Sequence, residues 1–213
     1  ILVEMNEKPL DLAEVIIKSS HFQSELKEVS ASLSVISEKL IKSNDGINIA
    51  PIINSVPGVY MHNGTLNTNR ITIRGIGSRN LFGTSKIRAY YEDIPLTNGS
   101  GETTIEDIEL QGIARMEILK GPSSSLYGAG LGGSIQLIAD KGLFSKQSLQ
   151  SAYTFGSYGL QKFWINTNLG NKTNAAKLTY SNTQIDGYRE NNELNRQTVT
   201  LASNHYLNDK NNL

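Results

Sequence analysis

The sequence predicts an α+β domain followed by antiparallel β-strands of an incomplete transmembrane β-barrel. In the first part of the chain, glycine and proline interrupt short apolar runs, which indicates short strands and short helices joined by turns. After about residue 146, apolar and polar residues alternate over segments of about ten residues, as in barrel strands. The 213 residues include 19 glycines, which argues against a helical bundle and for strands and turns.

The composition excludes several classes of site. Twenty Lys and Arg residues balance twenty Asp and Glu residues, so no basic field indicates a nucleic-acid partner. The chain has no cysteine, and its three histidines, His21, His62 and His205, lie far apart without metal-ligand spacing. No apolar run reaches the roughly 18 residues that a membrane-spanning helix needs. The sequence therefore predicts no cofactor, no metal site and no nucleic-acid partner.

Short strands and short helices are predicted in order along the first part of the chain. Alternating or β-prone residues predict strands at 34–37, 59–61, 70–74, 87–91 and 115–120. Short helices are predicted at residues 37–42 and 105–110. Asn63-Gly64 predicts a turn, and residues 75–83 form a glycine-rich loop. This part is therefore expected to be α+β.

Four longer strands are predicted in the second part, with apolar and polar side chains on opposite faces. They lie within residues 149–155, 162–169, 177–181 and 198–207. The connection at 171–174 is a tight turn, whereas 185–196 is a longer polar loop. A transmembrane barrel has short periplasmic turns and longer extracellular loops, so these segments are assigned to those two sides. The alternation alone also fits a soluble antiparallel meander.

A glycine run at residues 128–133 matches the dinucleotide-binding pattern G-x-G-x-x-G. That pattern needs a strand before the glycines, a helix after them and an acidic residue about 20 positions further on. Here residues 123–127 look helical and precede the glycines, and residues 135–138 look like a strand and follow them. The order is reversed, so nucleotide binding is disfavoured.

The region around these glycines resembles the late plug motif of TonB-dependent receptors. Residues 115–128, Arg-Met-Glu-Ile-Leu-Lys-Gly-Pro-Ser-Ser-Ser-Leu-Tyr-Gly, are similar to the family's R-I-E-V-L-K-G-P-x-S-x-L-Y-G, and Gly132-Gly133 and a strand follow. Three further blocks stand in the family's order: Val56-Pro57-Gly58-Val59, Ile73-Arg74-Gly75-Ile76-Gly77 and Tyr91-Glu92-Asp93-Ile94-Pro95-Leu96. In the last block Glu92-Asp93 replaces the family's Asp-Gly. Several ordered blocks make the resemblance specific.

The resemblance implies three regions. Residues 1–29 form an N-terminal segment, residues 30–142 a plug domain, and residues 143–213 the first strands of a truncated outer-membrane barrel. A transporter barrel of this kind has about 22 strands, and four strands cannot close. The chain is therefore expected to be a fragment, whose residues 147–213 stay disordered or aggregate when expressed alone.

The resemblance also implies three groups of functional residues. A TonB box, which adds as a strand to the sheet edge of its partner, is expected at Leu12, Ala13, Glu14, Val15, Ile16 and Ile17. Plug residues that form ion pairs with acidic groups of the barrel are expected at Arg74, Arg115, Glu117 and Lys120. Ligand contacts are expected in the glycine-rich loop at Arg79, Asn80 and Phe82.

The function implied is active transport through the outer membrane of a Gram-negative bacterium, without enzymatic activity. The expected cargo is a ferric siderophore or a related iron chelate, and the expected partners are TonB with its inner-membrane energising complex and outer-membrane lipid. Two alternatives are a ligand-sensing receptor that signals to a periplasmic regulator and, from the glycine run, a dinucleotide-binding enzyme.

Overall fold

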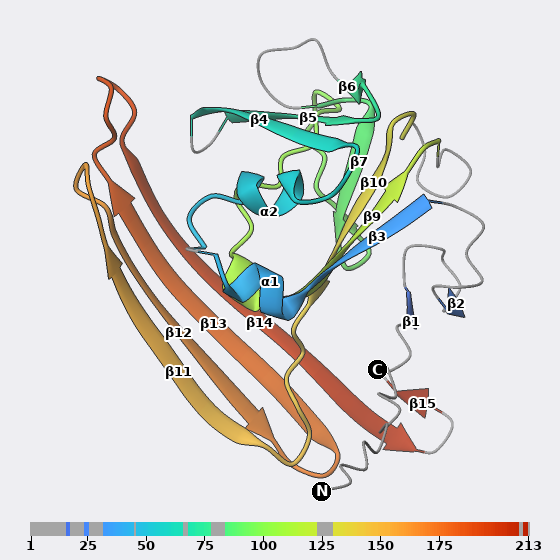
Figure 1. Cartoon of the computed structure of the whole chain (residues 1–213). Helices are drawn as coiled ribbons and strands as arrows, with labels where there is room; N and C mark the ends of the chain where they lie inside the picture. Colours follow the sequence, from blue (N-terminus) through green and yellow to red (C-terminus); the bar gives the residue numbers. More distant parts are fainter. Residues whose placement is uncertain are drawn as a thin grey trace, which may run out of the picture.

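The computed structural model describes residues 16–17, 24–25, 32–44, 46–65, 68–77, 84–122, 130–208 and 211–212. The chain forms an α+β plug unit, residues 32–139, and a curved antiparallel wall sheet that begins at residue 147 (Figure 1). The predicted fold class is therefore confirmed. No helix among the described residues is long and apolar enough to cross a membrane.

The plug unit contains two sheets, and a separate short pair lies near the N-terminus. The main sheet has the order β3-β9-β10-β7-β8, in which only β10 and β7 are parallel neighbours. Its strands are β3 (Ser32–Ser37), β7 (Ile87–Tyr91), β8 (Ile94–Pro95), β9 (Ile113–Lys120) and β10 (Gly133–Ala139). The second sheet is formed by β4 (Val59–Thr65), β5 (Thr68–Ile73) and β6 (Ile76–Gly77). The short pair is β1 (Ile16–Ile17) with β2 (Ser24–Glu25).

The helices are short and begin at capping signals in the sequence. In α1 (Glu38–Lys42), the Ser37 side chain accepts from the backbone N–H of Leu40 at 3.4 Å, as an N-cap does. In α2 (Ala50–Asn54), a proline occupies the first turn, where its missing N–H costs nothing. A 3-10 turn, η2 (Leu110–Gly112), follows Glu109, whose side chain accepts from the N–H of Gln111.

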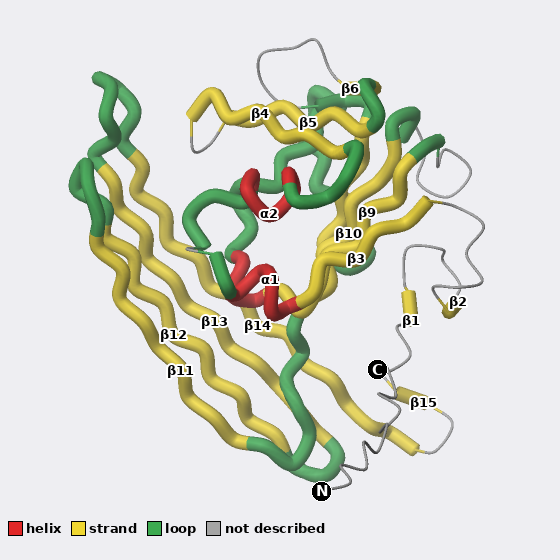
Figure 2. The backbone as a smooth tube through the Cα atoms, in the orientation of Figure 1, coloured by secondary structure: helices red, strands yellow, loops and turns green. Residues whose placement is uncertain are grey.

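The core of the plug unit is rich in isoleucine. Both helices lie between the β4–β5 hairpin, the main sheet and the wall sheet (Figure 2), and each contributes buried isoleucines. Buried members of this core include Ile36, Ile41, Ile52, Ile53, Ile71, Ile73, Ile87, Ile105, Ile113, Ile118 and Ile135. Burial of each such side chain contributes about 1.5–3 kcal/mol, so the plug unit has a core of its own.

The wall sheet places its apolar side chains outside and its polar side chains against the plug unit. Its strands are β11 (Gln147–Phe155), β12 (Gln161–Gly170), β13 (Asn174–Ile185), β14 (Leu194–Asn208) and β15 (Asn211–Asn212). Leu149, Phe155, Val199 and Leu201 are each at least 67% exposed. The buried inner face carries Lys162, Asn166, Asn168, Lys177, Thr179, Ser181 and Thr183. A soluble meander would bury the apolar face instead, so this polarity identifies a barrel wall.

Two predicted elements are wrong. No turn forms at Asn63-Gly64, because β4 continues to Thr65 and a register shift between Asn63 and Thr65 absorbs the extra residue. Residues 105–110 form no helix; Ile105 is buried in a loop, and only the 3-10 turn η2 follows. The polar loop predicted at 185–196 is shorter, because β13 and β14 pair as far as Ile185 and Leu194.

Gly133 is a position where the main sheet requires glycine. Its φ is 139°, and a Cβ there would lie 2.1 Å from the carbonyl oxygen of Leu119. We expect Gly133→Ala to destabilise the pairing of β9 and β10 by roughly 2–4 kcal/mol, measured as faster amide hydrogen exchange in both strands. Gly99→Ala is the control, because a Cβ at Gly99 meets no atom within 4 Å. Equal exchange in the two variants would contradict this account.

Candidate functional site: the plug–wall interface

Three basic side chains project from the inner face of the wall sheet toward the plug unit. Lys162 on β12, Lys177 on β13 and Arg196 on β14 occupy alternate, inward-facing positions. Thr183 pairs with Lys162 on one side and with Arg196 on the other, so both cations stand in one row across the sheet. In the described part of the chain, acidic residues lie opposite these basic side chains.

The most buried contact joins Glu109 to Lys162. The Lys162 ammonium group lies 3.0 Å from Glu109 Oε1 and donates to the carbonyl oxygen of Gly46 at 2.6 Å. Lys162 is 0% exposed and Glu109 is 4% exposed. Gly46 has φ +69°, and a Cβ there would lie 3.3 Å from Lys162 Nζ and 3.1 Å from the Gln111 amide nitrogen, so glycine lets the backbone approach closely. Removing one partner of such a pair leaves the other charge buried and unpaired.

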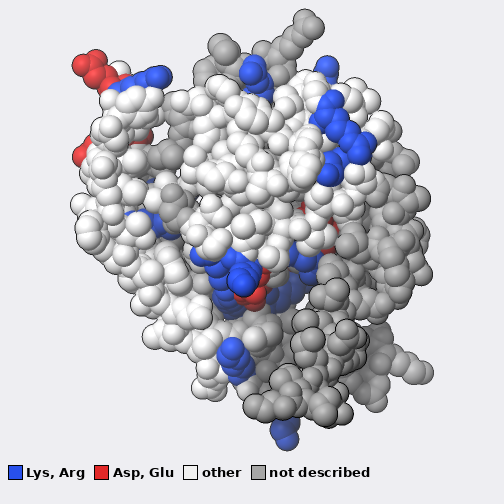
Figure 3. Space-filling view, in the orientation of Figure 1, with Lys and Arg blue, Asp and Glu red and all other residues white. Residues whose placement is uncertain are grey.

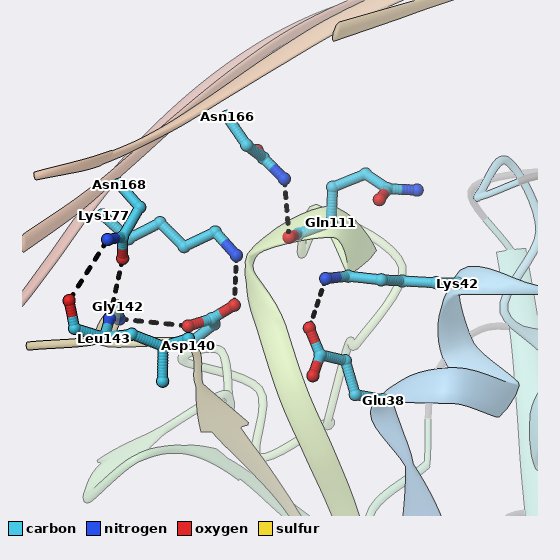
Figure 4. Close-up of polar contacts among 9 residues, drawn as sticks. All are labelled: Glu38, Lys42, Gln111, Asp140, Gly142, Leu143, Asn166, Asn168 and Lys177. Carbon is cyan, nitrogen blue, oxygen red and sulfur yellow. Dashed lines mark hydrogen bonds and ion pairs between the residues drawn. The ribbon is translucent and has the colours of Figure 1, made fainter. Parts of the chain in front are cut away.

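A second contact holds the segment that connects the plug unit to the wall sheet. Asp140, directly after β10, forms an ion pair with Lys177, and its other oxygen accepts from Gly142 N–H at 3.0 Å (Figure 4). The Asn168 amide nitrogen donates to the carbonyl oxygens of Leu143, at 3.2 Å, and Lys146, at 2.5 Å. Asn168 Oδ1 accepts from Leu143 N–H at 2.7 Å. One asparagine thus fixes the path of residues 143–146.

A third contact lies next to the first. The Arg196 guanidinium donates to the carbonyl oxygen of Glu106 and lies 4.0 Å from the largely exposed carboxylate of Asp107. Asn166 donates to the carbonyl oxygen of Gln111 at 3.3 Å. In the described structure, residues 106–112 of the plug unit, the connecting segment 140–146 and the carbonyl oxygen of Gly46 therefore supply these polar contacts with the wall.

The predicted ion-pair residues occupy a different part of the plug unit. Arg115 Nε lies 2.8 Å from Glu117 Oε1, and both residues belong to β9, where Glu117 is 0% exposed. Lys120 donates to the carbonyl oxygen of Pro57 at 3.1 Å. Arg74 follows β5, is exposed and has φ 51°. The structure brings Arg115 and Glu117 together, and the pairing of all four residues with acidic barrel groups stays a prediction.

The other predicted site residues are mostly beyond the described part of the chain. Ile16 and Ile17 are extended in β1 and pair with Glu25 and Ser24. Leu12, Ala13, Glu14 and Val15 lie outside the described residues, as do Arg79, Asn80 and Phe82. Among the described residues, no group of three or more His, Asp or Glu side chains is placed to hold a metal ion.

Sequence reasoning missed the residues that form the plug–wall contacts. Glu109, Asp140, Lys162, Asn168 and Lys177 were not singled out, although the alternation did place both lysines and Asn168 on the polar face of their strands. A further signal was present. Residues 92–109 contain six acidic residues and no basic one, and this segment ends at the buried pair.

An α+β unit bound to the polar inner face of a sheet with an apolar outer face defines a plugged outer-membrane β-barrel. Residues 25–135 match the family model described as "TonB-dependent Receptor Plug Domain". The chain belongs to this family, the TonB-dependent receptors, as the sequence motifs predicted.

Named relatives support the assignment. The chain is 31% identical over 130 residues to the iron-regulated outer membrane virulence protein of Vibrio cholerae, covering 60% of this chain and 20% of the relative. It is 26% identical over 140 residues to the vitamin B12 transporter BtuB of Vibrio vulnificus, covering 64% and 22%. The chain therefore spans about a fifth of the length of these relatives. The predicted outer-membrane location is confirmed.

Solved structures show the same fold. The siderophore receptor PiuA of Acinetobacter baumannii superposes with a TM-score of 0.68 at 23% identity, covering 89% of this chain and 26% of that chain. The pyoverdine outer membrane receptor FpvA of Pseudomonas aeruginosa superposes with a TM-score of 0.72 at 18% identity, covering 89% and 27%. The family consists of transport receptors rather than enzymes.

The buried pair yields a prediction about stability. Lys162→Met removes the ammonium group and leaves Glu109 buried and unpaired, so it should weaken plug–wall docking by about 3–5 kcal/mol. The double variant Glu109→Gln/Lys162→Met should recover most of that loss, because neither charge remains. Hydrogen exchange of residues 106–112 in the full-length receptor measures the change, with Lys172→Met on the exposed turn as control. If the double variant is as unstable as Lys162→Met alone, the proposed role of the Glu109–Lys162 pair is refuted.

The contacts of Asn168 yield a second prediction. Asn168→Ala removes all three hydrogen bonds to residues 143–146, which should loosen this segment by about 1–3 kcal/mol while the core of the plug unit stays intact. Limited proteolysis and hydrogen exchange of the segment test this. Thr167→Ala, on the opposite face of β12, should leave the segment protected.

Proposed function

We propose that the protein to which this chain belongs carries out TonB-dependent active transport across the outer membrane, with a ferric siderophore or a related iron chelate as cargo and the plug unit as gate. The observation that carries the proposal is the plug–wall interface, where Lys162 of the wall pairs with Glu109 of the plug unit and Lys177 pairs with Asp140, the residue that directly follows it. The names of relatives, which include iron-regulated and siderophore receptors, support iron chelates as cargo.

An interface made of ion pairs suits a gate, because the plug unit must first be held in the barrel and must later move. A buried pair contributes little net stability over an apolar contact, but it fixes position, because each charge needs its partner. When the plug moves, water enters the polar lumen and solvates both charges, so release costs less than exposing an apolar interface of the same area. The polar face of the wall, with Asn166, Thr179 and Ser181, would then line an aqueous path.

The energy is proposed to come from TonB and its inner-membrane complex, so the chain needs no nucleotide site. The TonB box, Leu12 to Ile17, would add as a strand to the edge of a TonB sheet, and backbone hydrogen bonds would hold it there. Arg79, Asn80 and Phe82 are proposed to contact the ligand. Arg74, Arg115, Glu117 and Lys120 are proposed to face acidic groups of the complete barrel.

Transport by the full-length receptor can be separated from ligand binding. In cells that lack their own receptor, the full-length protein should support uptake of a radiolabelled ferric chelate, and deletion of TonB should abolish uptake while surface binding persists. Val15→Pro removes a backbone N–H from the TonB box, so it should reduce uptake by at least about tenfold without changing surface binding.

The control for this variant is Val15→Ala, which keeps the N–H and should transport normally. Uptake that continues without TonB would contradict active transport. Normal uptake by Val15→Pro would show that the TonB box lies elsewhere.

A further inference from the structure

A hollow lies on the wall sheet beside the tight turn that joins β12 to β13. Its volume is about 190 Å³, and its lining includes Gln147, Leu169, Asn171, Asn174, Ala176 and His205. We call it the turn notch. This volume is several times the roughly 30 Å³ of one water molecule, and it is smaller than the roughly 300–1,000 Å³ of a pocket that encloses a drug-sized ligand. The turn notch therefore suits one end of a larger molecule.

The alternation of side chains shows that the turn notch opens on the lipid-facing side of the wall. Gln147 is two residues from Leu149 on β11, so both side chains share one face. His205 is four residues from Leu201 on β14 and shares its face in the same way. Leu149 and Leu201 belong to the exposed apolar face of the sheet. The turn notch is thus at the end of the surface that contacts hydrocarbon.

The turn notch has an apolar border and a polar border. Ala176 pairs with Leu169 of β12, and its small side chain leaves the gap between the strands uncovered. Leu169 and Leu178, the next outward residue of β13, are both exposed and form the border toward the middle of the sheet. Asn171 and Asn174 form the border on the turn side. A molecule that fits the turn notch therefore has an apolar part and a polar part.

Hydrogen bonds within the turn hold the polar border in place. Asn171 Oδ1 accepts from the backbone N–H of Thr173 at 2.9 Å and from that of Asn174 at 2.7 Å. Asn174 Oδ1 lies 2.8 Å from His205 Nδ1. The carbonyl oxygen of Asn171 accepts from Ser145 N–H at 2.9 Å. Because the border is already ordered, little conformational entropy is lost when a ligand binds there.

The charge around the turn notch is positive. Residues 141–185 contain five lysines and no Arg, Asp or Glu. Three of these lysines have acidic partners, whereas Lys146 and Lys172 are exposed and form no ion pair within the described part of the chain. Toward the lower end of the face drawn in Figure 3, the charged side chains visible among the described residues are Lys or Arg. The polar part of the ligand is therefore expected to be anionic.

We propose that the turn notch binds the phosphate-bearing headgroup of a phospholipid in the periplasmic leaflet of the outer membrane. The tight turn marks the periplasmic side of the wall. The phosphate group meets the ammonium group of Lys172 and the side-chain amides of Gln147 and Asn171, which can donate hydrogen bonds to it. An acyl chain lies against Leu169 and Leu178. A free phosphate ion would use only the polar border, so the apolar border selects a phosphate that is anchored to a lipid.

Native mass spectrometry of the full-length receptor, purified in detergent and stripped of lipid, measures binding of the first molecule of phosphatidylglycerol. Ala176→Leu fills the turn notch and should weaken this binding at least about fivefold. Lys172→Gln removes one cation near the phosphate and should also weaken it about fivefold. Ser151→Leu is the control, because it adds a leucine at an outward position of β11 that does not line the turn notch.

Two further probes separate the parts of the lipid. Glycerol phosphate carries the anionic group without acyl chains, and diacylglycerol carries the chains without the phosphate. We expect neither to displace phosphatidylglycerol at equal concentration. Displacement by glycerol phosphate would identify a site for free phosphate groups and would overturn the inference, as would displacement by diacylglycerol.

Receptor abundance in the outer membrane shows whether each variant folds, and Lys172→Gln changes only an exposed side chain. Binding of the first phosphatidylglycerol that is unchanged in Lys172→Gln and in folded Ala176→Leu overturns the inference. An equal loss in Ser151→Leu and Ala176→Leu would show that lipid covers the whole apolar face without a specific site, which overturns it too. The inference concerns the membrane and not the cargo, so none of these outcomes affects the proposed transport.

Discussion

Lys162 is fully buried at the boundary between the two units of the chain, and its charge is tolerated because two separate segments of the plug unit supply polar partners for it. Glu109 supplies the counter-charge, and Gly46 supplies a carbonyl oxygen through a backbone conformation that favours glycine. These two groups come from plug segments separated by the whole of the β4–β5 hairpin and the main-sheet strands β7 and β8. The ammonium group of one wall residue therefore brings together two plug segments that only the folded plug unit places side by side.

The wall sheet reverses the arrangement of a soluble protein. Its apolar side chains face outward, and its polar side chains are covered by the plug unit. The outer face needs lipid, and the inner face, where the plug unit covers it and excludes water, needs charged and hydrogen-bonding partners from the plug unit. The plug unit contacts the wall through short polar segments, and its isoleucine core stays inside the plug unit. Two folded parts can thus be joined firmly without sharing one hydrophobic core.

Local patterns predicted the strands and their faces, because the alternation of apolar and polar residues, with a period of two, can be seen in the sequence itself. Lys162 and Phe163 were placed on opposite faces of β12, and the structure agrees. The partner of Lys162 could not be predicted, because Glu109 is 53 residues away and the contact depends on how the two units meet. The family motifs located the plug but directed attention to Arg115 and Glu117, which pair with each other. At Asn63-Gly64, sheet pairing overrode a local turn preference.

The length of β14 determines how the barrel meets its surroundings. Fifteen residues at about 3.3 Å each, tilted by about 45°, rise roughly 35 Å, whereas the apolar band of such barrels is about 25 Å tall. The strand therefore extends about 10 Å beyond the hydrocarbon. Outward-facing Asn195 and Gln197 lie near the N-terminal end of β14, where polar side chains suit a headgroup layer. The ends of the strand accordingly lie at the level of the lipid headgroups, so the polar outward side chains there meet headgroups and water rather than hydrocarbon.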